Sequence, residues 1–290
     1  MTDLIENVLD ALTAQYVLPE VATRAAASIR SHLEAGRYDG LDEETLCARL
    51  TEDLQAETGD RHLRVRPRAT ETLDARTSEE VMAAMIAGFR RENFGIARAE
   101  VLDGNIGCIE LRLVLDVSLA GRTASAAMEF VSRTDALILD LRRRRGGSPN
   151  GVQFWASHLF ADDSVHLEDV VGPDGVRQYW TLAHLDGERY LDRPVFVLTS
   201  GETFSGGEQL AYDLQALGRA TIMGETTRGG AHPTRFVPIS PSVEVTIPWA
   251  RPVNPVTGAN WEGTGVVPDV AVPAAEALDA ALRRALDAVE

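Results

Sequence analysis

A serine followed by two glycines and a glutamate lies where a strand pattern changes to a helix pattern. The segment Ser205-Gly206-Gly207-Glu208 comes after the β-type run Val195–Leu198 and before leucines at helical spacing. As structure, the S-x-x-E spacing is a capping box that closes the first turn of a helix. As chemistry, it presents a serine hydroxyl beside bare glycine N–H groups. Spacing alone favours the cap, and both interpretations of Ser205 stay open at this point.

A second glycine pair follows another expected strand. Gly146-Gly147 comes after the apolar run 136–141, which is typical of a strand buried on both faces. In open α/β sheets, ligands gather beyond the carboxyl ends of the strands. The N–H groups of both glycine pairs can therefore face Ser205. Such an oxyanion hole contributes about 2.7–4 kcal/mol per donor. Acyl transfer is compatible with this pattern, although position 203 is threonine, so the G-x-S-x-G elbow is absent.

A nucleophilic serine needs a general base and a group that orients the base. Two of the six histidines lie in loops that are candidates for this task. His62 closes the helical first part of the chain, and His232 follows a glycine-rich loop after an expected strand. Glu262 is a lone carboxylate between a tryptophan and a glycine. The simpler interpretation, an ordinary loop or core residue, applies to each of the three.

Composition excludes several other kinds of site. The chain has no lysine, so all 28 basic residues are arginine, and a Schiff-base lysine, a P-loop lysine and a Ser–Lys dyad are excluded. No histidine or cysteine spacing indicates a metal site, and no G-x-G-x-x-G follows a strand, so we expect neither a metal nor a cofactor. In the basic cluster 142–145, Arg144 and Arg145 are candidates for contact with a substrate carboxylate, unless the cluster is only a solvated loop.

Charge and hydropathy narrow the partners and the location. The net charge of -16 argues against nucleic acid or an anionic membrane as the main partner. No run approaches the ~20 apolar residues of a membrane span, and the first residues lack the basic region of a signal peptide. Cys47 and Cys108 make no disulfide framework and are expected to be small buried residues. We expect a cytoplasmic protein acting on a peptide or small acyl substrate, and we leave self-association open.

Periodicity divides the chain into a helical part and an α/β part. Helices are expected over 4–15, 19–34 and 43–57, which predicts a helical bundle at 1–66. The α/β core is predicted to fill 67–290, and residues 66–77 at its start are expected to be a linker. In the core, a hairpin around 103–105 and three alternations of strand and helix indicate a largely parallel sheet. Residues 235–249 are expected to form a β-ribbon at an edge, and 273–289 a final amphipathic helix.

Four ordered motifs resemble one family. They are "LILDLRRRRGG", "VLTSGETFSGGEQLAYDLQALG", "MGETTRGGAHP" and "RPVNPVTGANWEGTGVVPDV". Together they resemble the serine peptidase family of the tail-specific (C-terminal processing) proteases, the tricorn protease core and the interphotoreceptor retinoid-binding protein, and the helical start resembles the retinoid-binding branch. The resemblance implies a crotonase-like core, a spiral of ββα units, behind an N-terminal helical bundle. Residues 66–100 are too few for the PDZ domain that captures substrate tails in such proteases, so none is expected.

The resemblance also assigns roles. It implies that Ser205 is the nucleophile and that Gly206, with Gly146 and Gly147, forms the oxyanion hole. The function expected is that of a serine peptidase that forms an acyl-enzyme. Two alternatives remain: a non-proteolytic module for an apolar, retinoid-like or lipid-like ligand, and a small-molecule acyl hydrolase or transferase that uses the same site.

The general base is the point at which the family members differ. Tail-specific proteases use a Ser–Lys dyad, and this chain has no lysine to provide one. The tricorn core is therefore the better guide, with a Ser–His–Glu arrangement. Its histidine and glutamate correspond to His62 as the base and Glu262 as the orienting group. His232 is the second choice for the base.

Overall fold

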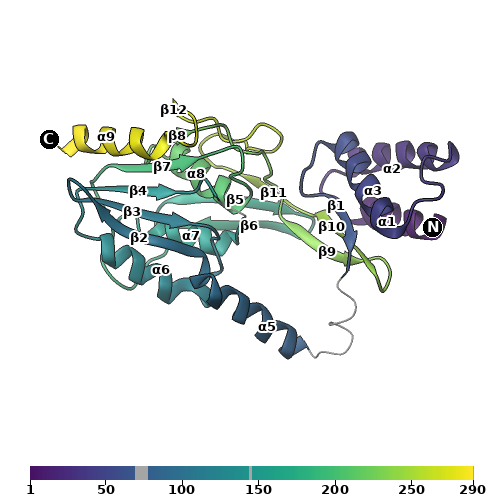
Figure 1. Cartoon of the computed structure of the whole chain (residues 1–290), viewed down its shortest axis with the longest axis horizontal. Helices are drawn as coiled ribbons and strands as arrows, with labels where there is room; N and C mark the ends of the chain where they lie inside the picture. The colour runs from purple at the N-terminus through teal and green to yellow at the C-terminus, as the bar shows by residue number, and fades with distance from the viewer. Residues whose placement is uncertain (69–77, 144–145, 290) are drawn as a thin grey trace. The chain divides into compact units, whose positions relative to one another are not determined.

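The computed structural model describes residues 1–68, 78–143 and 146–289 (Figure 1). By compactness the chain forms two units, each built from separate segments of sequence. The first unit holds residues 1–82, 171–176 and 232–252, and the second holds 83–170, 177–231 and 253–290. The predicted division at 66/67 is a single cut in the sequence, whereas these units interleave. Most of the predicted linker, residues 69–77, lies outside the described residues.

The first unit packs three helices with a small antiparallel sheet. The first helix ends before Tyr16, the second begins with Pro19 in its first turn, and the third is capped by the Asp42 carboxylate, which accepts the N–H of Thr45. The third helix ends at Gly59, whose φ of 72° is the left-handed conformation that favours glycine. The elements are α1 (Thr2–Gln15), α2 (Pro19–Glu34), α3 (Glu43–Thr58), β1 (Arg64–Pro67), β9 (Thr234–Pro238) and β10 (Val243–Pro248), with strand order β1-β10-β9.

The second unit is built on a six-stranded sheet in the order β12-β8-β7-β4-β3-β2. Only the β2–β3 hairpin is antiparallel, and the other neighbouring strands run parallel. The strands of this sheet are β2 (Ile96–Leu102), β3 (Ile106–Leu111), β4 (Ala136–Asp140), β7 (Val195–Thr199), β8 (Thr221–Gly224) and β12 (Val270–Ala271), and the helices are α6 (Val117–Val131), α7 (Pro149–Ser157), α8 (Gly206–Ala216) and α9 (Ala277–Val289).

Helices cover both faces of this sheet, as Figure 1 shows. Leu137, Leu139 and Val197 point to the face packed by α6, α7 and α8. Ile138 and Phe196, one residue out of phase, point to the face packed by α9. Because successive side chains of a strand alternate between faces, strands buried on both sides read as continuous apolar runs. This is the arrangement that the run 136–141 predicts.

The predicted fold class is confirmed: a helical first part followed by a mixed α/β core with parallel crossovers. The described residues between β1 and β2 form only α5 (Ser78–Arg91) and a short 3-10 turn, Asn93–Gly95, and no PDZ domain is evident among them. No helix in the described ranges is long and apolar enough to cross a membrane. Cys47 and Cys108 are buried, as expected, and burial raises the pKa of both thiols to about 11.

One hairpin escaped the sequence analysis. β5 (His166–Gly172) and β6 (Gly175–Trp180) belong to a third sheet, in the order β11-β5-β6, where β11 is Arg251–Val253. A turn signal for this hairpin is present in the sequence as Pro173-Asp174-Gly175. Gly175 has a φ of 120°, which favours glycine.

Candidate active site

Ser205 lies at the N-terminus of α8 with an uncommon backbone conformation. Its φ of 53° and ψ of −126° are unfavourable for a residue with a Cβ, and such conformations cost about 1–3 kcal/mol and concentrate at functional sites. Ser205 and Glu208 form the predicted capping box, but an asymmetric one. The Ser205 N–H donates to the Glu208 carboxylate at 2.7 Å, and the backbone N–H of Glu208 faces the Ser205 hydroxyl oxygen in the looser half of the box. The capping box uses the hydroxyl oxygen only as an acceptor, so it makes no use of the hydroxyl proton.

Glu208 is fully buried and accepts four hydrogen bonds. Besides the N–H of Ser205, its oxygens accept the Thr227 hydroxyl at 2.6 Å, the Gly229 N–H at 2.6 Å and the Gly230 N–H at 3.0 Å. Burial raises the pKa of this carboxyl, and the four hydrogen bonds oppose that rise. Glu208 thus joins the start of α8 to the loop after β8, a contact that the capping-box spacing did not predict.

Gly146 and Gly147 lie close to Ser205 and Gly206. A Cβ added to Gly206 would lie 3.0 Å from the backbone N and Cα of Gly147. A Cβ on Gly146 would lie 3.9 Å from the Ser205 Oγ. The N–H groups of Gly147 and Gly206 donate no hydrogen bond to any residue in the described ranges. Two close N–H groups beside a serine hydroxyl are thus available to a ligand.

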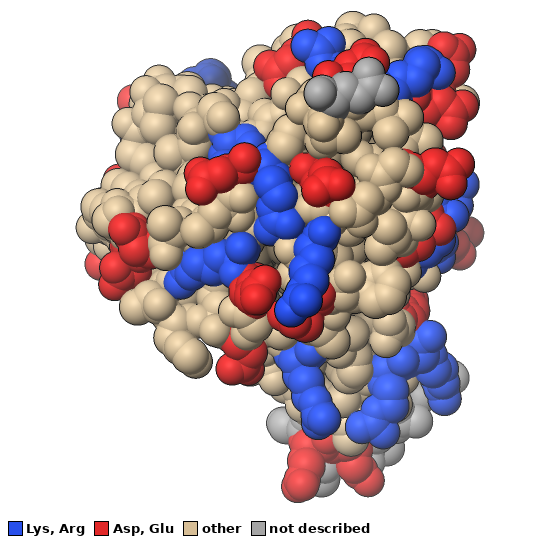
Figure 2. Space-filling view, turned by 90° about the vertical axis from the view of Figure 1, so that its left-hand side faces the viewer, with Lys and Arg blue, Asp and Glu red and all other residues tan. Residues whose placement is uncertain are grey.

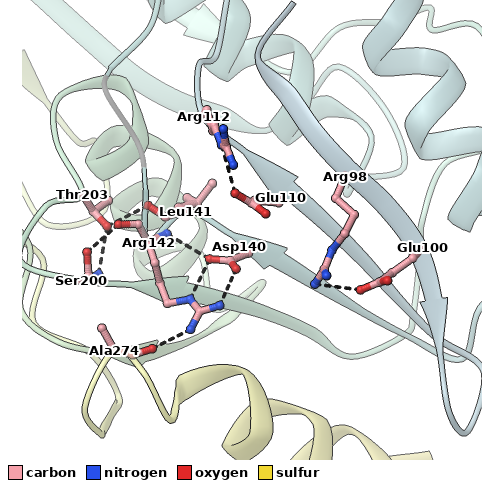
Figure 3. Close-up of polar contacts among 10 residues, drawn as sticks. All are labelled: Arg98, Glu100, Glu110, Arg112, Asp140, Leu141, Arg142, Ser200, Thr203 and Ala274. Carbon is pink, nitrogen blue, oxygen red and sulfur yellow. Dashed lines mark hydrogen bonds and ion pairs between the residues drawn. The ribbon is translucent and has the colours of Figure 1, made fainter. Parts of the chain in front are cut away.

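Hydroxyl groups hold the two glycine-bearing loops together, as Figure 3 shows. The Thr203 hydroxyl donates to the carbonyl of Leu141 at 2.9 Å, and the Ser200 hydroxyl donates to that of Arg142 at 2.6 Å. The sequence analysis missed both contacts. Thr203 occupies the position of the first glycine in the G-x-S-x-G elbow. A glycine there could not make the hydrogen bond that the Thr203 hydroxyl donates to Leu141.

Within the arginine cluster 142–145, the Arg142 side chain is already hydrogen-bonded to other residues of the protein. The Arg142 guanidinium makes two hydrogen bonds to Asp140, at 2.9 and 2.7 Å, and a third to the carbonyl of Ala274 at 2.6 Å (Figure 3). Arg143 is exposed. Arg144 and Arg145, the two candidates for substrate contact, lie outside the described residues.

Glu262 is part of the second unit, like Ser205. Its Oε2 accepts the N–H of Ala231 at 2.5 Å, and the neighbouring Trp261 indole donates to the carbonyl of Gly230 at 2.9 Å. The loop that Glu208 holds through Gly229 and Gly230 is therefore also held by the segment that carries Glu262. The predicted role of Glu262, orienting a histidine, remains a prediction.

Both candidate bases belong to the first unit, where they share one buried carboxylate. Asp60 accepts the backbone N–H of His62 at 3.0 Å, and its other oxygen lies 2.7 Å from the Nδ1 of His232 and 3.1 Å from the Tyr16 hydroxyl. A buried carboxylate on Nδ1 is the arrangement that orients a catalytic imidazole. The sequence analysis missed Asp60, although it precedes His62 by two residues.

The chain belongs to peptidase family S41. The family model matches residues 105–272, and the model of the N-terminal domain of peptidase S41 in eukaryotic IRBP matches residues 1–92. The first match includes the Ser205 turn, both glycine pairs and Glu262. The family resemblance inferred from the four motifs is confirmed.

Solved structures share the fold at low sequence identity. A lipoprotein from Streptococcus agalactiae is 15% identical with a TM-score of 0.65, and the photosystem II D1 C-terminal processing protease is 16% identical with a TM-score of 0.56. For both, the match covers 98% of this chain and 96% of the other. The tricorn protease is 12% identical with a TM-score of 0.61, over 98% of this chain and 36% of its own. Family and fold support a serine peptidase, and do not favour the module for an apolar ligand.

Proposed function

We propose that this protein is a serine peptidase that uses Ser205 as its nucleophile, His62 as its general base and Glu262 to orient His62. The observation that carries the proposal is the strained turn of Ser205 between two glycine N–H groups that have no partner in the described part of the chain. A serine that served only as a cap would need neither the strain nor the uncommitted donors.

The steps follow from this arrangement. The Ser205 Oγ bonds to the substrate carbonyl carbon while its proton passes to His62. The resulting oxyanion accepts the N–H groups of Gly206 and Gly147, at the start of α8, where the helix dipole also favours negative charge. His62 then protonates the leaving amine, and the C–N bond breaks to leave an acyl-enzyme. Water, deprotonated by His62, releases the acid and restores Ser205.

A fluorophosphonate probe tests the nucleophile. We expect the wild-type protein to be labelled at Ser205 and Ser205→Ala to show no labelling while its thermal transition persists. Ser31→Ala, which changes an exposed serine on α2, is the matched control and should keep a labelled Ser205. Equal labelling of wild type and Ser205→Ala would refute the assignment.

Replacing each histidine identifies the base. We expect His62→Ala to lower the labelling rate by about 10²–10⁴-fold, the usual contribution of a general base, and His232→Ala to lower it much less. The opposite order would make His232 the base and Asp60 its orienting group.

Substrate libraries separate peptide from ester chemistry. We expect cleavage of peptide amides that is lost in Ser205→Ala. Turnover of small esters or acyl transfer without any peptide cleavage would instead establish a small-molecule acyl hydrolase or transferase on the same residues.

A further inference from the structure

The β2 strand lies at one edge of the six-stranded sheet (Figure 1). Within the part of the chain that the structure describes, it pairs with β3 only, and the ladder is regular from Arg98 to Leu102, after a bulge next to Ile96. Apart from this ladder, no backbone N–H or carbonyl of residues 97–101 has a hydrogen-bond partner in the same ranges. Every second residue of an edge strand directs its N–H and C=O groups outward, so β2 can pair with one more strand.

A mainly apolar groove of about 340 Å³ runs along this edge, between β2 and α6. Its lining includes Ala97 and Ala99 of β2 and Ala126 and Phe130 of α6, and we call it the β2–α6 groove. The Phe130 side chain is 58% exposed, and Val101, on the same face of the strand as Ala99, is 48% exposed. Contiguous exposed apolar surface is typical of interaction sites.

The opposite face of β2 carries two charges of opposite sign. The Arg98 Nη2 lies 2.9 Å from the Glu100 Oε1, and both side chains remain partly exposed, at 47% and 32% (Figure 3). Across the ladder, Arg98 is paired with Glu110 of β3, so opposite charges already face each other between strands. This alternation can continue onto a further strand that places a carboxylate opposite Arg98 and an arginine opposite Glu100.

We propose that the β2 edge pairs, antiparallel, with the β2 edge of a second copy of this chain, about a two-fold axis at Ala99. In this register, Arg98 of each copy lies opposite Glu100 of the other. Opposite charges at directly paired positions contribute about 0.2–1 kcal/mol, and like charges are unfavourable. Moving the axis by one residue would place two arginines or two glutamates opposite each other. The charges of β2 therefore select this register.

The same axis brings the two β2–α6 grooves together. A two-fold axis perpendicular to the sheet keeps the α6 face of both copies on the same side, so that Val101 and Phe130 of both copies lie on one side of the joint. Such an interface is isologous, and each contact occurs twice. The charge pattern and the apolar groove thus fit the same occupant, a second copy of this chain.

Sedimentation velocity at physiological salt tests the pairing. We expect the wild-type protein to form dimers at concentrations up to about 100 µM. Arg98→Glu and Glu100→Arg each place like charges opposite each other on both sides of the axis, so each should weaken the dimer at least about tenfold. Arg24→Glu, which reverses an exposed arginine on α2, is the matched control and should associate as the wild type does.

Mixing the two charge variants gives a sharper test. In a mixed pair, the two glutamates of one chain lie opposite the two arginines of the other, so opposite charges are restored at every paired position. We expect Arg98→Glu and Glu100→Arg to form a heterodimer when mixed in equal amounts, although each alone stays monomeric. Recovery in the mixture also shows that neither variant lost association through misfolding.

Hydrogen exchange locates the joint. Amides of residues 98–101 should exchange more slowly in concentrated wild-type protein than in Arg98→Glu, because the outward N–H groups gain carbonyl partners. Phe130→Ser should weaken the dimer through the α6 side without changing any charge.

Three results would overturn the proposal. A wild-type protein that stays monomeric would leave the edge to a partner of another kind, and dimers that persist in both charge variants would place the interface elsewhere. Variants that fail to associate when mixed would exclude this register. None of these measurements depends on Ser205, so failure of the proposed peptidase activity would leave the result unaffected.

Discussion

Glu208 connects the proposed nucleophile to the loop that follows β8. Its carboxylate accepts N–H groups from Ser205, Gly229 and Gly230 and the hydroxyl of Thr227. These groups come from two segments, and only an acceptor with two oxygens satisfies all four. The strained conformation of Ser205 is therefore held by a residue that does not touch the substrate in the proposed mechanism.

Replacing Glu208 should slow the chemistry more than it weakens ligand binding. In Glu208→Gln one carboxylate oxygen becomes an amide NH₂ that faces N–H donors, so Ser205 should shift from its position. Because small misplacements of reacting groups slow reactions, we expect the rate of fluorophosphonate inactivation at saturating probe to fall about tenfold to hundredfold. The half-saturation concentration should change little. Glu202→Gln, an exposed glutamate of the same loop, is the control. A change in half-saturation alone would contradict this positioning role.

The contact between the glycine pairs makes a second prediction at this scale. In Gly206→Ala the added methyl meets the backbone of Gly147 at 3.0 Å, so the two loops must separate. We expect the inactivation rate to fall by at least about tenfold, since the N–H groups of the proposed oxyanion hole then diverge. Gly201→Ala is the control, because its Cβ would be 3.8 Å from the nearest side-chain atom. An unchanged rate in Gly206→Ala would show that the contact does not matter.

At the scale of the element, α8 and β5 each contribute one buried acid, Asp213 and Glu168. Asp213 accepts the Asn254 amide at 3.0 Å, and Glu168 of β5 accepts the Gln209 amide at 2.5 Å. One oxygen of each carboxyl has no hydrogen-bond partner in the described ranges. Burial raises the pKa of both groups well above the ordinary value, and the charge of Asp213, with a smaller effect of Asp169, raises that of Glu168 further.

This pair predicts the direction of the pH dependence of stability. Because their pKa values are higher in the folded than in the unfolded protein, the folded state binds protons more tightly. The free energy of unfolding should therefore fall as the pH rises from the ordinary carboxyl range through the raised pKa values. In Asp213→Asn one of these ionisations is removed, and with it the negative charge that raises the pKa of Glu168. We expect this variant to be about 1–2 kcal/mol more stable at pH 8 and less dependent on pH.

Urea unfolding at pH 5 and pH 8 measures this effect. Asp186→Asn, whose carboxylate is exposed, is the control and should follow the wild type at both pH values. Equal loss of stability by Asp213→Asn at both pH values would show that ionisation of this pair does not affect the stability of the fold.

At the scale of the whole molecule, the first unit depends on residues far apart in the sequence. Val243, Val245 and Ile247 of β10 are fully buried among side chains of α1, α2 and α3. A chain lacking residues 1–66 would leave this apolar strand face without its cover, although the predicted boundary falls at that position.

We expect Ile247→Ala to destabilise the first unit by about 2–5 kcal/mol, the usual cost of truncating a buried isoleucine. Hydrogen exchange should show the loss in α1, α2 and α3, roughly 190 or more positions earlier in the chain. Ile239→Ala, at a half-buried position beyond β9, should cost less. Unchanged protection of the three helices would show that they fold without β10.

Charge is also a property of the whole molecule. Figure 2 shows arginine and carboxylate side chains next to one another over one face, without a continuous basic surface there. With a net charge of -16, the protein should not be retained on heparin at physiological salt and should bind an anion exchanger at pH 7. Retention on heparin would contradict the expectation that nucleic acid is not the partner.

The sequence by itself determined the elements and the family. The helix bounds of α2, the parallel strands and the two glycine pairs follow from periodicity, turn residues and motif order, because these signals are local. The β5–β6 hairpin was missed because its turn signal was not used, although the residues that carry it were present in the sequence.

Only the tertiary structure decided which distant groups meet. Three contacts join residues whose spacing in the sequence gives no sign that they meet. They are Glu208 with Gly229 and Gly230, His232 with Asp60, and Glu168 with Asp213. The physical reason is that hydrogen bonding and burial act through space, whereas periodicity reports only the neighbours of a residue along its own helix or strand.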